Sequence, residues 1–158
     1  MVHMGKTTTV GPWGGNGQIN WDDGSYDGVR IITLEYGKCI NTIQVIYDKN
    51  GKLIQGARHG NVGGHPATGF AQIILQYPEE ILTTVSGYYS KLKDYYEVDP
   101  IIRSLTFKTN MGTYGPYGVE EGAPFSASFE TEKIVGFLGK SGWYLDAIGF
   151  HITPTKKI

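Results

Sequence analysis

The stretch Gly139-Lys140-Ser141-Gly142-Trp143-Tyr144-Leu145-Asp146 runs directly into the alternating segment Ala147-Ile148-Gly149-Phe150-His151-Ile152. This pattern predicts a tight loop that leads into a strand, because glycine adopts backbone conformations that other residues avoid. Backbone N–H groups beside the Asp146 carboxylate provide both donors and an acceptor, which suits a sugar hydroxyl. On this stretch alone, an ordinary hairpin loop with one solvated aspartate remains the other interpretation.

The rest of the chain predicts an all-β protein. Its 23 glycines and 11 tyrosines are typical of a turn-rich β structure, and no window keeps apolar residues at helical spacing. Asn50-Gly51 predicts a hairpin turn, and the tyrosine-rich passage 88–96 is expected to be a loop with strand-like flanks. Strands are predicted over 32–36, 43–47, 71–76, 81–86, 101–107, 125–129, 133–138 and 143–152.

Three glycine-rich passages, 11–17, 59–64 and 114–122, begin at similar intervals along the chain. The first of them, 11–17, is expected to be too rich in glycine for the interior of a regular element. The spacing predicts an internal repeat of about fifty residues, with each unit carrying several strands. Three such sheets around one core would close the structure without long exposed edges. Chance clustering in a glycine-rich chain is the alternative explanation.

Length and composition restrict the classes of function. A chain of 158 residues is most simply one domain, and its net charge of -1 argues against nucleic-acid binding. No apolar run reaches the roughly 18 residues of a membrane helix, so membrane insertion is not expected. Residues 1–9 lack the apolar core of a signal peptide, Cys39 is the single cysteine, and no N-x-S/T sequon occurs. A cytoplasmic protein is therefore expected.

Six segments of the chain carry motifs of one known family: Gly11 to Gly17, Arg103 to Asn110, Thr113 to Gly118, Gly122 to Ser126, Ile134 to Phe137 and Gly142 to Gly149. Taken in order, these segments resemble those of the plant jacalin-related lectins. The resemblance implies a single domain over 10–154, between an N-terminal tail, 1–9, and a C-terminal tail, 155–158. It also implies a β-prism I fold: three four-stranded Greek-key sheets with pseudo-threefold symmetry.

The family binds monosaccharides through a G-x-x-x-D motif, which Gly142 and Asp146 match at its two ends. The resemblance implies that the backbone N–H groups of Trp143 and Tyr144 donate to the sugar ring oxygen and O6. It implies that the Asp146 carboxylate accepts from the O4 and O6 hydroxyls, which makes it the strongest single contact. No metal and no cofactor is implied.

A further family contact comes from a glycine amide in the first glycine-rich loop. The family string W-G-G-x-G-G, counted from Trp13, places its last glycine at Gln18, so Gly17 and Gln18 are both candidates. The Gln18 backbone still has an N–H, but its side chain would either crowd the sugar or add a contact. The segment 17–21 is continuous, whereas galactose-preferring members are cut there. The resemblance therefore favours glycans that contain mannose or glucose.

Tyr88 and Tyr89 fall where the family has a loop beside the sugar. A tyrosine there would stack its ring on sugar C–H groups, and the alternative is an ordinary surface tyrosine. Trp13 is expected to anchor the first glycine-rich loop by packing.

The family's second G-x-x-x-D position corresponds to Gly37–Asn41, which ends in an amide. A second site is therefore expected to be absent or weaker. With one site per chain, useful binding of multivalent glycans would require a homodimer or higher homo-oligomer.

Other functions remain as alternatives. A glycosidase would pair Asp146 with Asp22 or Asp23, but no matching motif supports it. A jacalin-fold interaction or defence-complex protein would keep the fold with weak or altered binding, to galactose or to oligosaccharides. His59 and His65 fit no zinc spacing, and Asp48-Lys49-Asn50-Gly51 is better explained by a hairpin than by a calcium loop.

Overall fold

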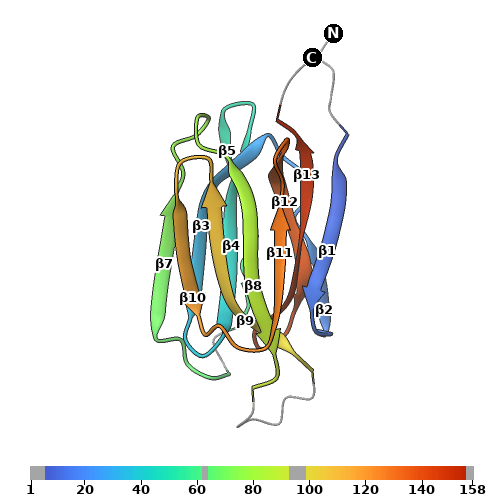
Figure 1. The fold of residues 1–158 in the computed structure, drawn as a ribbon, viewed down its shortest axis with the longest axis vertical. Helices are drawn as coiled ribbons and strands as arrows, with labels where there is room; N and C mark the ends of the chain where they lie inside the picture. Colours follow the sequence, from blue (N-terminus) through green and yellow to red (C-terminus); the bar gives the residue numbers. More distant parts are fainter. Residues whose placement is uncertain (1–5, 62–63, 93–98, 156–158) are drawn as a thin grey trace.

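The computed structural model describes residues 6–61, 64–92 and 99–155, and within these ranges every regular element is a strand. None of the described residues belongs to a helix that could cross a membrane. The first strand begins, and the last strand ends, at the same end of the elongated molecule (Figure 1). The strands are β1 (Thr8–Gly14), β2 (Ile19–Asp22), β3 (Gly28–Tyr36), β4 (Ile40–Lys49), β5 (Lys52–Gln55), β6 (His59–Gly60), β7 (Gly69–Ile74), β8 (Leu82–Ser90), β9 (Ile101–Thr109), β10 (Thr113–Gly118), β11 (Ala123–Ser128), β12 (Glu132–Ser141) and β13 (Leu145–Pro154).

The strands form three antiparallel sheets, which confirms the predicted β-prism I fold. Sheet A has the order β1-β13-β12-β2, sheet B the order β5-β4-β3-β7 and sheet C the order β10-β9-β8-β11. The two-residue strand β6 also pairs with β4, so sheet B has one strand more than predicted. In each sheet the two central strands pair with each other. The first and last strands of the domain, β1 and β13, pair in sheet A.

The pairing registers show the pseudo-threefold symmetry residue by residue. In each sheet, the second central strand carries one unpaired, bulged residue near its start. This residue is Asp146 in sheet A, Asn41 in sheet B and Arg103 in sheet C, and all three are buried. Strands β13, β4 and β9 all begin at the end of the prism opposite the one where β13 ends, so the three bulges lie near that end (Figure 1).

Three glycines explain why each repeat carries a glycine-rich passage. Gly14, Gly60 and Gly118 have positive φ angles of 130°, 98° and 90°. A Cβ atom on any of them would lie only 2.0 to 2.2 Å from the carbonyl oxygen of the bulged residue in the same sheet. Only glycine permits both this conformation and this close approach.

Apolar residues on the inner faces of the three sheets meet in one core. Its largest fully buried side chains include Tyr47, Phe107, Phe137 and Phe150. Trp13 packs against this core, with its ring centroid 5.6 Å from that of Phe125, so the expected anchoring role of Trp13 agrees with the structure.

Several predicted boundaries were wrong. Residues 11–14 lie inside β1, and 114–118 lie inside β10, because a bulge in each strand accommodates the Gly-Pro pair. Tyr88 and Tyr89 lie in β8 rather than in a loop. Strand β13 begins at Leu145, so Trp143 precedes it. The Asn50-Gly51 turn is confirmed: both residues have positive φ and join the paired ends of β4 and β5.

Candidate functional site

The loop from Gly142 to Tyr144 connects the central strands of sheet A and is closed by its own backbone. Ser141 pairs with Leu145, and the Gly142 N–H donates to the Tyr144 carbonyl at 3.0 Å. The corresponding loop of sheet B repeats this bond, from the Gly37 N–H to the Cys39 carbonyl at 2.9 Å. The two loops therefore share one backbone geometry and differ in side chains.

Asp146 and Gly17 lie side by side. The Gly15 N–H donates to the Asp146 carbonyl at 2.9 Å, which holds the first glycine-rich loop against the bulge. A Cβ on Gly17 would lie 3.0 Å from the Asp146 carboxylate carbon and 2.8 Å from the backbone of Ser141. The structure thus brings together the backbone of the first loop and the carboxylate at the end of the G-x-x-x-D motif. Asp146 is 8% exposed.

The side chain of Tyr144 is a structural support that the sequence did not reveal. It is buried in a small cluster with Cys39, Leu92 and Ile101, at the point where the loops of the three sheets meet. Its hydroxyl accepts a hydrogen bond from the His65 N–H at 2.7 Å. The side chain therefore ties the loop of sheet A to the long loop of sheet B and fixes the direction of the Tyr144 backbone.

The other predicted site residues differ in how exposed they are and in what they contact. Trp143 is 62% exposed, and Gln18 is exposed next to Gly17. Tyr88 and Tyr89 are half-buried on β8, where Tyr89 packs against Phe125 and the core. The described contacts of Tyr89 thus run into the core rather than toward Asp146.

The equivalent position in sheet B holds a different group. Asn41 is 1% exposed, and its Nδ2 donates to the His65 carbonyl at 2.7 Å. The long loop between β6 and β7 therefore supplies a fixed acceptor against the amide. A carboxylate at this position would face that carbonyl oxygen without a proton to share.

In sheet C the bulged residue is Arg103. Its Nε donates to the Lys38 carbonyl at 2.8 Å, and its Nη1 donates to the Ser90 hydroxyl at 2.9 Å. The guanidinium thus links sheet C to the loop of sheet B. Among the three equivalent positions, only the one in sheet A carries a carboxylate.

Other candidate groups are engaged in structural pairs. His59 stacks on Trp21 and bonds Asp23 at 2.7 Å, and Asp23 also accepts from the Tyr47 hydroxyl at 2.6 Å. His151 bonds Asp22 at 2.8 Å. Partial burial raises the pKa of Asp22, but its hydrogen bonds outweigh that effect, and the pKa lies below its ordinary value. Within the described ranges, no group of three or more acidic, histidine or cysteine residues is arranged to hold a metal ion.

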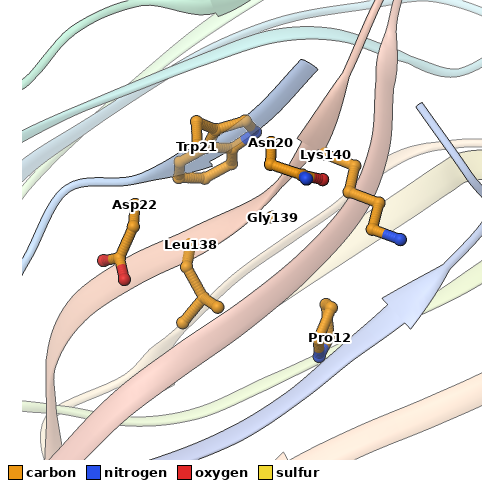
Figure 2. Close-up of a pocket in the computed structure, with 7 residues that line it drawn as sticks. All are labelled: Pro12, Asn20, Trp21, Asp22, Leu138, Gly139 and Lys140. Carbon is orange, nitrogen blue, oxygen red and sulfur yellow. The ribbon is translucent and has the colours of Figure 1, made fainter. Parts of the chain in front are cut away.

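An open groove runs over the outer face of sheet A, beside rather than at the Asp146 position. In Figure 2, Asp22 and Lys140 lie at opposite ends of this groove, and Pro12 faces it from β1. The Lys140 Nζ is 3.4 Å from Asn16 Oδ1 in the first glycine-rich loop. The groove contains none of the predicted sugar-contacting residues.

Comparisons with known proteins give a consistent result. A family model described as the Jacalin-like lectin domain matches residues 10–151. Jacalin-related lectin 19 of Arabidopsis thaliana is 57% identical over 150 residues, covering 95% of this chain and 82% of that protein. A galactose-specific lectin of Morus indica is 42% identical over 153 residues, covering 93% and 92%.

Solved structures show the same likeness in three dimensions. The structure of a mannose-specific jacalin-related lectin from Morus nigra in complex with mannose has a TM-score of 0.87 and 48% sequence identity, covering 97% of this chain and 98% of that one. The family model that covers most of the chain and the relative at 57% identity agree on one family. The chain therefore belongs to the jacalin-related lectins and is a carbohydrate-binding protein rather than an enzyme.

Proposed function

We propose that this lectin binds mannose and glucose residues of glycans at one main site per chain, between Gly17 and the loop that ends in Asp146. The observation that carries the proposal is the close approach of the Gly17 backbone to Asp146: a Cβ on Gly17 would lie 3.0 Å from the carboxylate carbon. Trp143 and Tyr144 donate from their backbones, and Asp146 accepts from two sugar hydroxyls. Charge-assisted bonds of this kind are the strong ones in a neutral-ligand site.

The preference for mannose and glucose rests on the uncut first loop and on stereochemistry. O4 is equatorial in mannose and glucose and axial in galactose, so one rigidly held carboxylate meets different hydroxyl directions in the two classes. The exposed Gln18 follows Gly17 directly, and its backbone N–H is the proposed further donor to the sugar. The mannose complex of the Morus nigra lectin supports the proposal, and the galactose-specific relative defines the competing candidate.

Calorimetric titration with methyl α-mannoside, methyl α-glucoside and methyl α-galactoside tests this specificity. We expect heat of binding with the first two sugars and a much weaker response with the third. Stronger binding of the galactoside would replace the proposal with the galactose alternative. The absence of measurable heat with all three sugars would favour an interaction protein or a lectin that requires oligosaccharides.

The Tyr144 side chain offers a test of how the site is held. In Tyr144→Phe the His65 N–H loses this partly buried hydrogen bond, which is worth about 0.5–1.5 kcal/mol. We expect mannoside affinity to fall by roughly 2–10-fold, because a loop that is less well fixed must be ordered on binding. Calorimetry measures the change, and Tyr114→Phe in sheet C, which loses the bond from its hydroxyl to Glu80, is the matched control. An unchanged affinity would contradict the supporting role of Tyr144.

The pseudo-equivalent position in sheet B gives a separate prediction. Asn41→Asp restores the motif of sheet B but places a carboxylate against the His65 carbonyl. We expect it to lower the free energy of unfolding by about 1–3 kcal/mol and to leave one sugar bound per chain. Denaturant unfolding and the calorimetric stoichiometry check the two parts. A stoichiometry of two sugars per chain would contradict this expectation. It would show that the loop between β6 and β7 moves away from the new carboxylate, and that sheet B lacked only a charged acceptor.

We also propose that the chain acts as a homodimer or higher homo-oligomer, because a weak site gains from multivalency.

We propose a cytoplasmic location as well, because the single cysteine of the chain, Cys39, is buried and the chain cannot form an internal disulfide.

A further inference from the structure

One edge strand of the prism lacks the features that usually protect sheet edges. Strand β7 forms an edge of sheet B and pairs with β3 in an uninterrupted register from Ile74 to Gly69. Its six residues include no charged residue and no proline. Phe70 and Ile74 point outward and are 65% and 63% exposed. Proteins normally blunt such an edge with charge, proline or a bulge, because its free backbone groups invite another strand.

The pseudo-threefold symmetry provides an internal comparison. The registers make Asn20 and Asp22 of β2, and Pro124 and Ser126 of β11, the equivalents of Phe70 and Gln72 of β7. Thus β2 carries a charge and β11 carries a proline, whereas β7 carries exposed apolar side chains.

The remaining edges are also protected. Strands β1 and β10 contain a proline and a bulge, and β5 is short and begins with a lysine. Strand β7 is therefore the exception among the six edges of the three described sheets.

We propose that β7 pairs antiparallel with β7 of a second copy of this chain, about a twofold axis through Gln72. Phe70 and Ile74 lie two residues on either side of Gln72, so the axis places Phe70 of one copy opposite Ile74 of the other. Because both of these side chains are apolar and the strand carries no charge, its outward residues can pack against their own copies, as a twofold interface requires. Ile31 of β3 and Ile46 of β4 continue the row from Ile74 across the outer face of sheet B.

The antiparallel pairing of the two β7 strands determines the directions in which the two sugar sites of the dimer face. Strand β7 runs along the long axis of the prism, and the loop that ends in Asp146 lies at the end where β13 begins (Figure 1). Antiparallel pairing therefore points the two binding ends in opposite directions. Such a dimer bridges two separate glycans rather than gripping one branched glycan with both sites. This consequence rests on the proposed sugar site, whereas the pairing itself does not.

A charge exchange at the axis tests the pairing. Gln72→Lys and Gln72→Glu each place like charges directly opposite one another, and Ser126→Lys puts the same charge at the equivalent position of β11. Sedimentation velocity without sugar, over a range of protein concentrations, measures association, and circular dichroism confirms folding. We expect a wild-type dimer, a dissociation constant raised roughly tenfold or more in each Gln72 variant, and an unchanged dimer in Ser126→Lys.

An equimolar mixture of Gln72→Lys and Gln72→Glu chains is expected to restore the dimer, because opposite charges then meet at the axis. Agglutination of mannose-coated beads should follow the dimer in each case. A monomeric wild type, a dimer indifferent to Gln72, or a mixture that stays monomeric would each overturn the proposal. Dimers that form as expected but fail to bind mannose would leave the pairing intact and reject the sugar site instead.

Discussion

Replacing Asp146 by asparagine is expected to weaken methyl α-mannoside binding by roughly 10–150-fold, the equivalent of losing a charged hydrogen-bond acceptor worth about 1.5–3 kcal/mol. The substitution keeps the size of the side chain, so the bulge and the Gly15 bond to the Asp146 carbonyl remain. An amide accepts with one oxygen only and presents N–H groups where the sugar presents hydroxyls. For a monosaccharide site of ordinary weak affinity, this loss removes detectable heat.

Asp22→Asn is the matched control for this prediction. Asp22 is an exposed carboxylate on β2 that bonds His151, and it stands outside the proposed site. We expect its replacement to leave mannoside affinity unchanged. Equal losses in the two variants would mean that overall charge, rather than a contact with Asp146, governs binding.

Replacing Gly17 by alanine is expected to damage both binding and stability. The φ angle of Gly17 is an ordinary one, so the reason is space: the added Cβ would lie 2.8 Å from the Ser141 backbone and 3.0 Å from the carboxylate carbon of Asp146. Ser141 belongs to the central strand β12 and cannot give way, so the first loop must lift from the carboxylate. We expect a loss of about 1–3 kcal/mol in the free energy of unfolding, as for overpacking, and a fall in mannoside affinity of more than about tenfold.

Gly142→Ala separates stability from binding. A Cβ on Gly142 would make only an ordinary contact, 3.6 Å from Asp146 Oδ1. We therefore expect an unchanged free energy of unfolding, with any loss of affinity reporting on contact with the sugar alone. Thermal and denaturant unfolding, together with calorimetry on both glycine variants, measure the difference. A Gly17→Ala variant as stable and as active as the wild type would show that the two loops do not meet as described.

Much of the fold follows from local patterns in the sequence. Alternation over 101–107 and 147–152 predicts the central strands β9 and β13, although both are buried at nearly every position rather than on one face only. Asn50-Gly51 fits a turn that needs two positive φ angles. The three glycine-rich passages contain Gly14, Gly60 and Gly118, whose backbones press against the three bulges. These features depend on neighbouring residues and are therefore visible without the structure.

Features that depend on distant contacts were missed. The equivalence of Arg103 in sheet C to Asp146 in sheet A was not predicted, because the loops that precede the two residues differ in length. The bond from the His65 N–H to the Tyr144 hydroxyl joins loops 79 residues apart. Strand formation at Tyr88 and Tyr89 depends on pairing with β9 and β11, which overrides the local preference of a tyrosine-rich, polar passage. The motif thus predicted which loop to examine, but not what holds it in place.

The most direct test of the central claim is to map mannose binding on the amide resonances of the protein by NMR. During titration with methyl α-mannoside, we expect the largest shifts at the backbone amides of Gly17, Gln18, Trp143 and Tyr144, with the Gly37–Asn41 loop nearly still. That result would place the sugar between the first glycine-rich loop and Asp146. Shifts centred on the Pro12–Trp21–Lys140 groove, or on the loop of sheet B, would contradict the account and move the site elsewhere on the prism.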